Sequence, residues 1–189
     1  MHNLSEETMK TLASFLSITT LGTALALGGL SLCAQAAEAP KKNWTPPEQK
    51  IYAQKLADET MAKHADLLSV TLHGVPPGMQ DVYTMFAGSY HDRIGNPDDP
   101  DDIDVSKKGI TILDPRWHRT NDTDKKFVVL MPMRDASGEN IGLIVYAFKN
   151  PTNPNTGKTE KEYLGKAVGL RDSLAKHIPN YNALFEPAK

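Results

Sequence analysis

Aromatic and cationic side chains are the residues of this chain best suited to hold a small ligand. They stand in or beside stretches with the character of β-strands: Tyr83, Tyr90, Arg93, Trp117 and Arg134. Aromatic walls with one or two cations suit a small organic acid, because a guanidinium pairs with a carboxylate through two hydrogen bonds. An alternative stays open, since aromatic residues on strands usually belong to the core and Arg134 could extend to water.

Histidines offer a second chemistry. Those beyond the N-terminal segment are His64, His73, His91, His118 and His177, and no two of them have a recognised metal-binding spacing. His91 and His118 could meet if their strands are neighbours, and neutral imidazole is a common ligand for haem iron or another metal. We favour ordinary surface histidines and assign no metal site and no cofactor. His91 and His118 join the five residues above as candidate ligand-binding residues.

Five aspartates lie between residues 98 and 104, and their carboxylates are possible ligands for calcium. The EF-hand template fails, because counting from Asp98 the sixth residue is not glycine and the twelfth is not glutamate. A solvated acidic loop is therefore the favoured interpretation. The chain also lacks the G-x-S-x-G elbow of hydrolases and a phosphate-binding glycine loop. We expect a binding protein with no catalytic residues rather than an enzyme.

The N-terminus has the three parts of a secretory signal peptide. Met9 and Lys10 form a short basic start, an apolar run extends from Thr11 to Leu32, and Ala34 and Ala36 form a cleavage site. Glu6 and Glu7 fit such a start poorly, so Met9 is the better first residue. We expect residues 1–36 to be removed and the protein to be periplasmic. The rival is an uncleaved anchor, because the apolar run is long enough to span a bilayer.

Charge and cysteine content exclude several classes of function. The formal net charge of the 189 residues is −2, which gives no electrostatic case for binding nucleic acid or an anionic membrane surface. Cys33 is the single cysteine and would leave with the signal peptide. The exported protein would then have no disulfide, no thiolate nucleophile and no covalently attached c-type haem. An ordinary hydrophobic core must hold it together.

The remaining chain predicts one α+β domain over residues 45–189, preceded by a short polar leader over 37–44. The capping residues at 45–48 and the helix formers after them predict a helix from Thr45 to about Asp66. The other expected elements are strands at 67–72, 82–90, 110–113, 126–134 and 139–149, a short helix at 102–108 and a long helix at 159–177. Consecutive strands without helical crossovers indicate an antiparallel sheet.

The last two strands carry a family resemblance. The string FVVLMPMRDASGENIGLIVYAF, with Pro132, Asp135, Gly138 and Ile141-Gly142, resembles the closing hairpin of periplasmic Cache and PAS-like sensor domains. The preceding DVSKKGITIL is similar to the short helix and strand before that hairpin. The resemblance covers about residues 67–149. It implies an antiparallel sheet with a long N-terminal helix and a C-terminal helix. Members of the family usually continue into a transmembrane helix and a signalling domain; this sequence shows neither before Lys189, so we expect a free-standing version.

Three functions follow as hypotheses. The first is an exported small-molecule-binding module of sensory type that takes a small organic ligand beside the sheet. The second is a haem- or metal-binding periplasmic redox protein that uses His91 or His118. The third is an interaction protein whose first helix forms a homodimer or docks on a membrane-bound partner.

Overall fold

A five-stranded antiparallel sheet forms the centre of the structure, a computed structural model that describes residues 40–115, 125–150 and 159–189. Its spatial order is β2-β1-β5-β4-β3, so β1 and β5 are central neighbours and β2 and β3 lie at the edges. The strands are β1 (Leu67–Gly74), β2 (Thr84–Gly88), β3 (Ile112–Pro115), β4 (Lys126–Arg134) and β5 (Asn140–Lys149). The α+β class and the antiparallel sheet expected from the sequence are confirmed.

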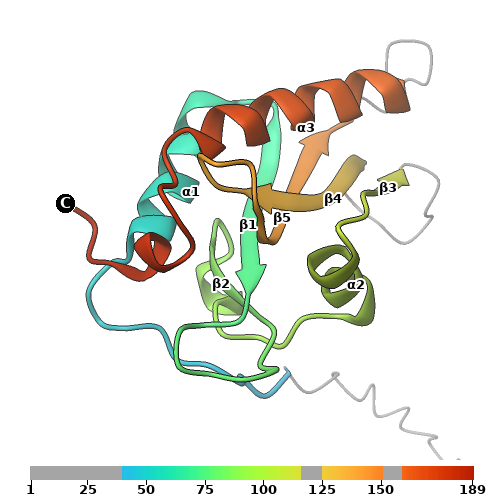
Figure 1. Cartoon of the computed structure of the whole chain (residues 1–189). Helices are drawn as coiled ribbons and strands as arrows, with labels where there is room; N and C mark the ends of the chain where they lie inside the picture. Colours follow the sequence, from blue (N-terminus) through green and yellow to red (C-terminus); the bar gives the residue numbers. More distant parts are fainter. Residues whose placement is uncertain (1–39, 116–124, 151–158) are drawn as a thin grey trace, which may run out of the picture. The chain divides into compact units, whose positions relative to one another are not determined.

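Helices cover both faces of this sheet (Figure 1), and the alternation of residues along β4 shows which helix covers which face. Phe127 and Val129 belong to the main core, together with buried residues of α1 (Tyr52–Lys63) and α3 (Glu160–Ala175). Val128 and Leu130 point to the opposite face, where they pack against α2 (Pro100–Lys108). Because successive strand residues point to opposite faces, α1 and α3 share one side and α2 occupies the other.

The β4–β5 hairpin matches its prediction closely. Its turn is held by Asp135, whose Oδ1 accepts hydrogen bonds from the backbone N–H groups of Ser137 at 2.9 Å and Glu139 at 3.1 Å. Gly138 has a φ of 89°, a left-handed conformation that glycine adopts without steric cost. The short helix and strand that the resemblance implies before this hairpin are present as α2 and β3.

The first helix starts later than predicted. Thr45 and the two prolines after it do not begin it; α1 starts at Tyr52 and ends at Lys63. The reason lies at the other end of the chain. The Tyr52 N–H donates to the carbonyl of Glu186 at 2.7 Å, and the Ala188 N–H donates to the carbonyl of Lys50 at 2.8 Å. This pairing holds Lys50 and Ile51 extended up to the start of α1, which the local helix signals do not predict.

The other helices follow their local signals. Thr159 caps α3 through a capping box with Glu162, and Gly109 ends α2 in the left-handed conformation with a φ of 66°. Two short 3₁₀ turns, η1 (His91–Arg93) and η3 (Asn182–Phe185), complete the described elements. Within the three described ranges, none of the helices is long and apolar enough to cross a membrane. The expected signal peptide lies outside these ranges.

Candidate functional site

His73 occupies a buried position on the face of the sheet that α2 covers. On β1 it alternates with Val70 and Leu72, which point into the main core on the opposite face. Its side chain is 10% exposed, and both ring nitrogens have partners. Nδ1 lies 2.7 Å from Oδ1 of Asp98, and Nε2 lies 2.7 Å from Oγ1 of Thr71. The imidazole is therefore held at both ends.

Asp98 is the most deeply buried carboxylate of this group. Its side chain is 0% exposed, and its Oδ2 has no hydrogen-bond partner among the described residues. The backbone explains the burial, because Pro97 forms a bridge with Thr84 and the Asp98 N–H donates to the carbonyl of Tyr83 at 3.1 Å. The interpretation of residues 98–104 as a solvated loop is thus wrong for Asp98, since strand pairing draws this segment against the sheet.

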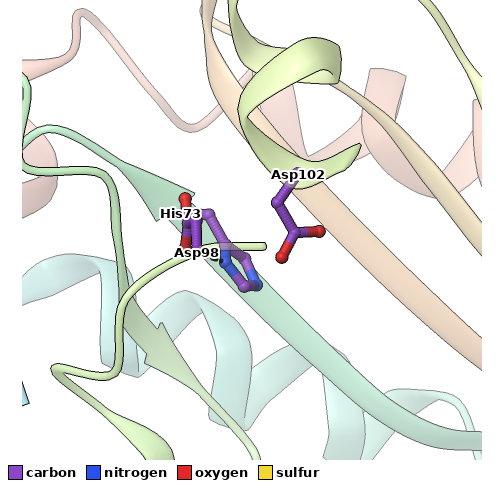
Figure 2. Close-up of side chains that lie close together, drawn as sticks. All are labelled: His73, Asp98 and Asp102. Atoms are coloured by element: carbon purple, nitrogen blue, oxygen red, sulfur yellow. Dashed lines mark hydrogen bonds and ion pairs between the residues drawn. The ribbon is translucent and has the colours of Figure 1, made fainter. Parts of the chain in front are cut away.

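Asp102 brings a second carboxylate to His73 from the first turn of α2 (Figure 2). Its Oδ2 accepts a hydrogen bond from the Asp99 N–H at 3.3 Å, as part of a capping box. Burial raises the pKa of Asp102 to about 6; the charge of His73 opposes this shift, and the negative charge of Asp98 adds to it. Two acids and one imidazole therefore converge from β1, a loop and a helix terminus.

Tyr181 connects this cluster to the C-terminal part of the chain. Its hydroxyl donates to the carbonyl of Val75 at 2.8 Å, two residues beyond His73. Burial raises the pKa of Tyr181, and the negative charge of Asp98 contributes in the same direction. The ring also packs edge-on against Phe86, with centroids 6.2 Å apart. The phenol thus anchors the chain just after the histidine.

A hydroxyl, an imidazole and a carboxylate follow one another in Thr71, His73 and Asp98, the order found in nucleophilic triads. Thr71 is 7% exposed and lies within a central strand, so its hydroxyl is not presented to a substrate. The arrangement serves instead to fix the orientation of the imidazole. His73, Asp98 and Asp102 offer ligand atoms that all lie within 4.8 Å of one another, so a small approach of these side chains would let all three contact one cation.

The candidate residues from the sequence lie in several places. Tyr83 adjoins the cluster through its carbonyl, and the Lys107 ammonium lies 4.9 Å from the centre of its ring. Tyr90 precedes η1 and Arg93 is its last residue, and the Arg93 guanidinium lies 4.8 Å from the centre of the Tyr90 ring. Trp117 and His118 lie outside the described residues.

His91 and Arg134 border two different cavities. His91, with a side chain 71% exposed, lines a cavity of 260 Å³ together with Gln54, Asp58 and Phe86. Arg134 lines a cavity of 420 Å³ beside α3, where its guanidinium donates to the carbonyl of Gly138 at 3.2 Å. The structure therefore does not bring these two side chains into one described pocket.

Sequence reasoning did not select His73, Asp98 or Asp102 as a group. A signal for His73 is visible in hindsight, because Ser69, Thr71 and His73 place polar residues at alternating positions of a strand that is apolar at Val70 and Leu72. A buried polar pair on a strand needs partners, and such partners mark a site. No local pattern indicates that Asp98 is one of them.

No family model matches the chain, and no curated protein matches it in sequence. Among solved structures, the sensor domain of E. coli DcuS matches at 17% identity and a TM-score of 0.35, over 62% of this chain and 70% of that one. A double mutant of the inducer-binding domain of the Acinetobacter PobR transcription factor, in complex with 3-hydroxybenzoic acid, matches at 12% identity and a TM-score of 0.38. That match covers 68% of this chain and 95% of the other.

The observed architecture defines the fold class of this protein. It is an α+β domain with an antiparallel sheet, a helix at each end of the chain's described part, and a short helix and strand before a closing hairpin. This is the plan that the PAS/Cache-like resemblance of the sequence implies.

Proposed function

We propose that this protein is an exported, small-ligand-binding module of sensory type, and that its ligand contacts the His73–Asp98–Asp102 cluster on the α2 face of the sheet. One observation carries the proposal: a fully buried carboxylate, Asp98, retains an oxygen without a hydrogen-bond partner among the described residues. Native proteins rarely bury such a group without a use for it. Binding sites are where unsatisfied groups are kept for a ligand.

The location of the cluster supports this proposal. Its three residues come from β1, from the loop after β2 and from α2, so a ligand there would bridge elements that are separate in sequence. A ligand that binds the folded state raises its stability according to its concentration and affinity. Binding at this point would therefore fix α2 against the sheet.

A thermal-shift screen of metal-free protein tests the proposal. Small carboxylates, amino acids, amines and the chlorides of divalent metals would be compared on the wild type, on His73→Gln and on His91→Gln. We expect at least one compound to raise the melting temperature of the wild type and of His91→Gln, but not that of His73→Gln. A shift lost in His91→Gln and kept in His73→Gln would move the site to the 260 Å³ cavity, and a screen without any shift would contradict the function.

Export is part of the same proposal and has its own test. The basic start, apolar run and Ala34-x-Ala36 motif of the sequence support cleavage after Ala36. Cell fractionation followed by N-terminal sequencing should give a periplasmic protein that begins at Ala37. A protein that stays in the membrane fraction with its N-terminus intact would show that the segment is an anchor.

A further inference from the structure

We infer that the ligand of this cluster is a divalent transition-metal ion, Zn²⁺ or Mn²⁺, bound by His73, Asp98 and Asp102. This inference rests on the proposed function and names its ligand class. The donor set is one imidazole nitrogen and two carboxylate oxygens, which is the nitrogen-and-oxygen set that these metals accept. Two carboxylates with a neutral imidazole also balance the charge of a divalent cation.

Asp98 supplies the first independent observation. Its side chain is 0% exposed, yet Oδ2 has no partner in the described part of the chain. Figure 2 shows this carboxylate beside the His73 ring, with Asp102 approaching from the helix. A cation between the two acids would satisfy the unpaired oxygen and would offset the repulsion between their charges.

Thr71 supplies the second observation, because it orients the histidine as a metal ligand requires. Metal-binding histidines usually donate the N–H of their other ring nitrogen to a fixed acceptor. Here Nε2 lies 2.7 Å from Thr71 Oγ1, which leaves Nδ1 directed at Asp98. The metal would replace the proton shared by Nδ1 and Asp98 Oδ1, and the Asp98 carboxylate would bind it through both oxygens, so that Oδ2 also gains a partner.

The three side chains must shift slightly before their donor atoms can all contact one metal ion. Metal–ligand bonds of about 2.0–2.2 Å place tetrahedral donors roughly 3.4 Å apart. His73 Nδ1 and Asp98 Oδ1 are 2.7 Å apart and would separate slightly, whereas Asp102 must approach, since the three donors now lie within 4.8 Å of one another. Asp102 lies in the first turn of α2 and is half-buried, so a rotamer change there can bring its carboxylate in.

A second acidic trio provides the matched control. Asp99, Asp101 and Asp102 also lie close together, but Asp99 and Asp101 are exposed and the Asp99 side chain caps α2. Calcium prefers six to eight oxygen ligands, which neither trio supplies. Substitution of Asp101 therefore removes acidic charge beside the cluster without removing any of the three proposed metal ligands.

The test is a calorimetric titration of the purified exported protein, treated with EDTA and dialysed, with ZnCl₂ and with MnCl₂. We expect one site per chain for at least one metal. Affinity should fall at least 100-fold in His73→Gln and in Asp98→Asn, and roughly 10- to 100-fold in Thr71→Val, because Thr71 acts through the histidine. Asp101→Asn should bind as the wild type does. Circular dichroism shows whether each variant is folded, and Asp102→Asn, changed at a half-buried position, replaces any variant that is not.

Three results would overturn the metal assignment. They are no binding at millimolar metal, equal binding by Asp98→Asn and the wild type, and loss of binding in Asp101→Asn alone. The proposed function is judged separately. If neither metal binds but an organic compound stabilises the metal-free protein and His73→Gln abolishes that effect, the ligand-binding function stands and the metal assignment fails.

Discussion

Gln54 on α1 offers a direct test of how the sheet edge is held. β2 is an edge strand, so one row of its backbone groups faces away from β1. Gln54, which is 9% exposed, both donates a hydrogen bond to one residue of this row and accepts one from it. Its Nε2 donates to the carbonyl of Gly88 at 3.0 Å, and its Oε1 accepts from the Gly88 N–H at 3.0 Å. The side chain thus makes the two hydrogen bonds with Gly88 that a neighbouring strand would otherwise make.

Gln54→Met keeps the length of the side chain and removes both hydrogen bonds to Gly88. It also removes the hydrogen bond that Nε2 donates to Oδ1 of Asp58 at 2.7 Å, but the Asp58 side chain is 36% exposed and can bond to water instead. No large cavity is left, so the expected loss of stability comes mainly from the N–H and the carbonyl of Gly88, which both lose their hydrogen-bond partner. Each buried polar group left without its partner costs about 1–3 kcal/mol, so the two groups of Gly88 together lower the free energy of unfolding by about 2–6 kcal/mol. For a domain of this size each kcal/mol lowers the melting temperature by roughly 2–4 °C.

Urea denaturation monitored by circular dichroism measures this loss, with Gln80→Met at an exposed position as the control. The control should stay within about 0.5 kcal/mol of the wild type, as most surface substitutions do. Hydrogen exchange at the Gly88 amide should also become faster in Gln54→Met. If Gln54→Met is as stable as Gln80→Met, the side chain does not hold the strand and the reasoning fails.

Three further predictions concern stability. Gly142 has a φ of 138°, and a Cβ there would lie 2.5 Å from the carbonyl oxygen of His73, so Gly142→Ala should lower the free energy of unfolding by at least about 1–3 kcal/mol. Gly165→Ala, in open space on α3, should raise it by about 0.5–1 kcal/mol; equal effects in urea melts would refute this contrast. The buried Tyr146 hydroxyl has no hydrogen-bond partner in the described ranges, so Tyr146→Phe should leave stability unchanged or raise it by up to about 1 kcal/mol. Tyr163→Phe loses a bond of 2.8 Å to Asn150 and should cost about 1 kcal/mol; a larger loss in Tyr146→Phe would count against the argument. The hydrogen bond from the Ser137 hydroxyl, with those from nearby backbone N–H groups, lowers the pKa of Asp135. The stability that the Asp135 carboxylate contributes is therefore present above the unfolded-state pKa of about 3.9, and it is lost as the pH falls through the lower pKa of the folded state. Urea midpoints between pH 6 and pH 2 should fall more for the wild type than for Asp135→Asn, and parallel curves would show that Asp135 does not contribute.

The sequence predicts the closing hairpin well because every signal for it is local. Alternating residues from 126 to 134 mark the strand, and Asp135 and Gly138 mark the turn. The start of α1 could not be predicted, because residues 50–52 pair with residues 186–188 at the far end of the chain. The capping motif at 45–48 favours an earlier start, but the pairing prevails and the helix begins at Tyr52.

The candidate site was missed for a similar physical reason. His73 is recognisable as polar on a buried strand, but Asp98 has the local character of an exposed acidic loop. Its burial depends on the bridge between Pro97 and Thr84 and on the approach of α2, which are tertiary effects. The residue types of Arg134 and His91 suit a ligand and predict a shared site, but their spacing along the chain does not determine which cavity each side chain borders.

The pairing of residues 50–52 with residues 186–188 also has a kinetic consequence. Segments so far apart meet only after a large loop closes, and contacts of high sequence separation slow folding. Synthesis proceeds from the N-terminus, so this pairing cannot form until the last strand, α3 and residues 186–188 have emerged. We therefore expect the start of α1 to be fixed late, after most of the chain has been synthesised.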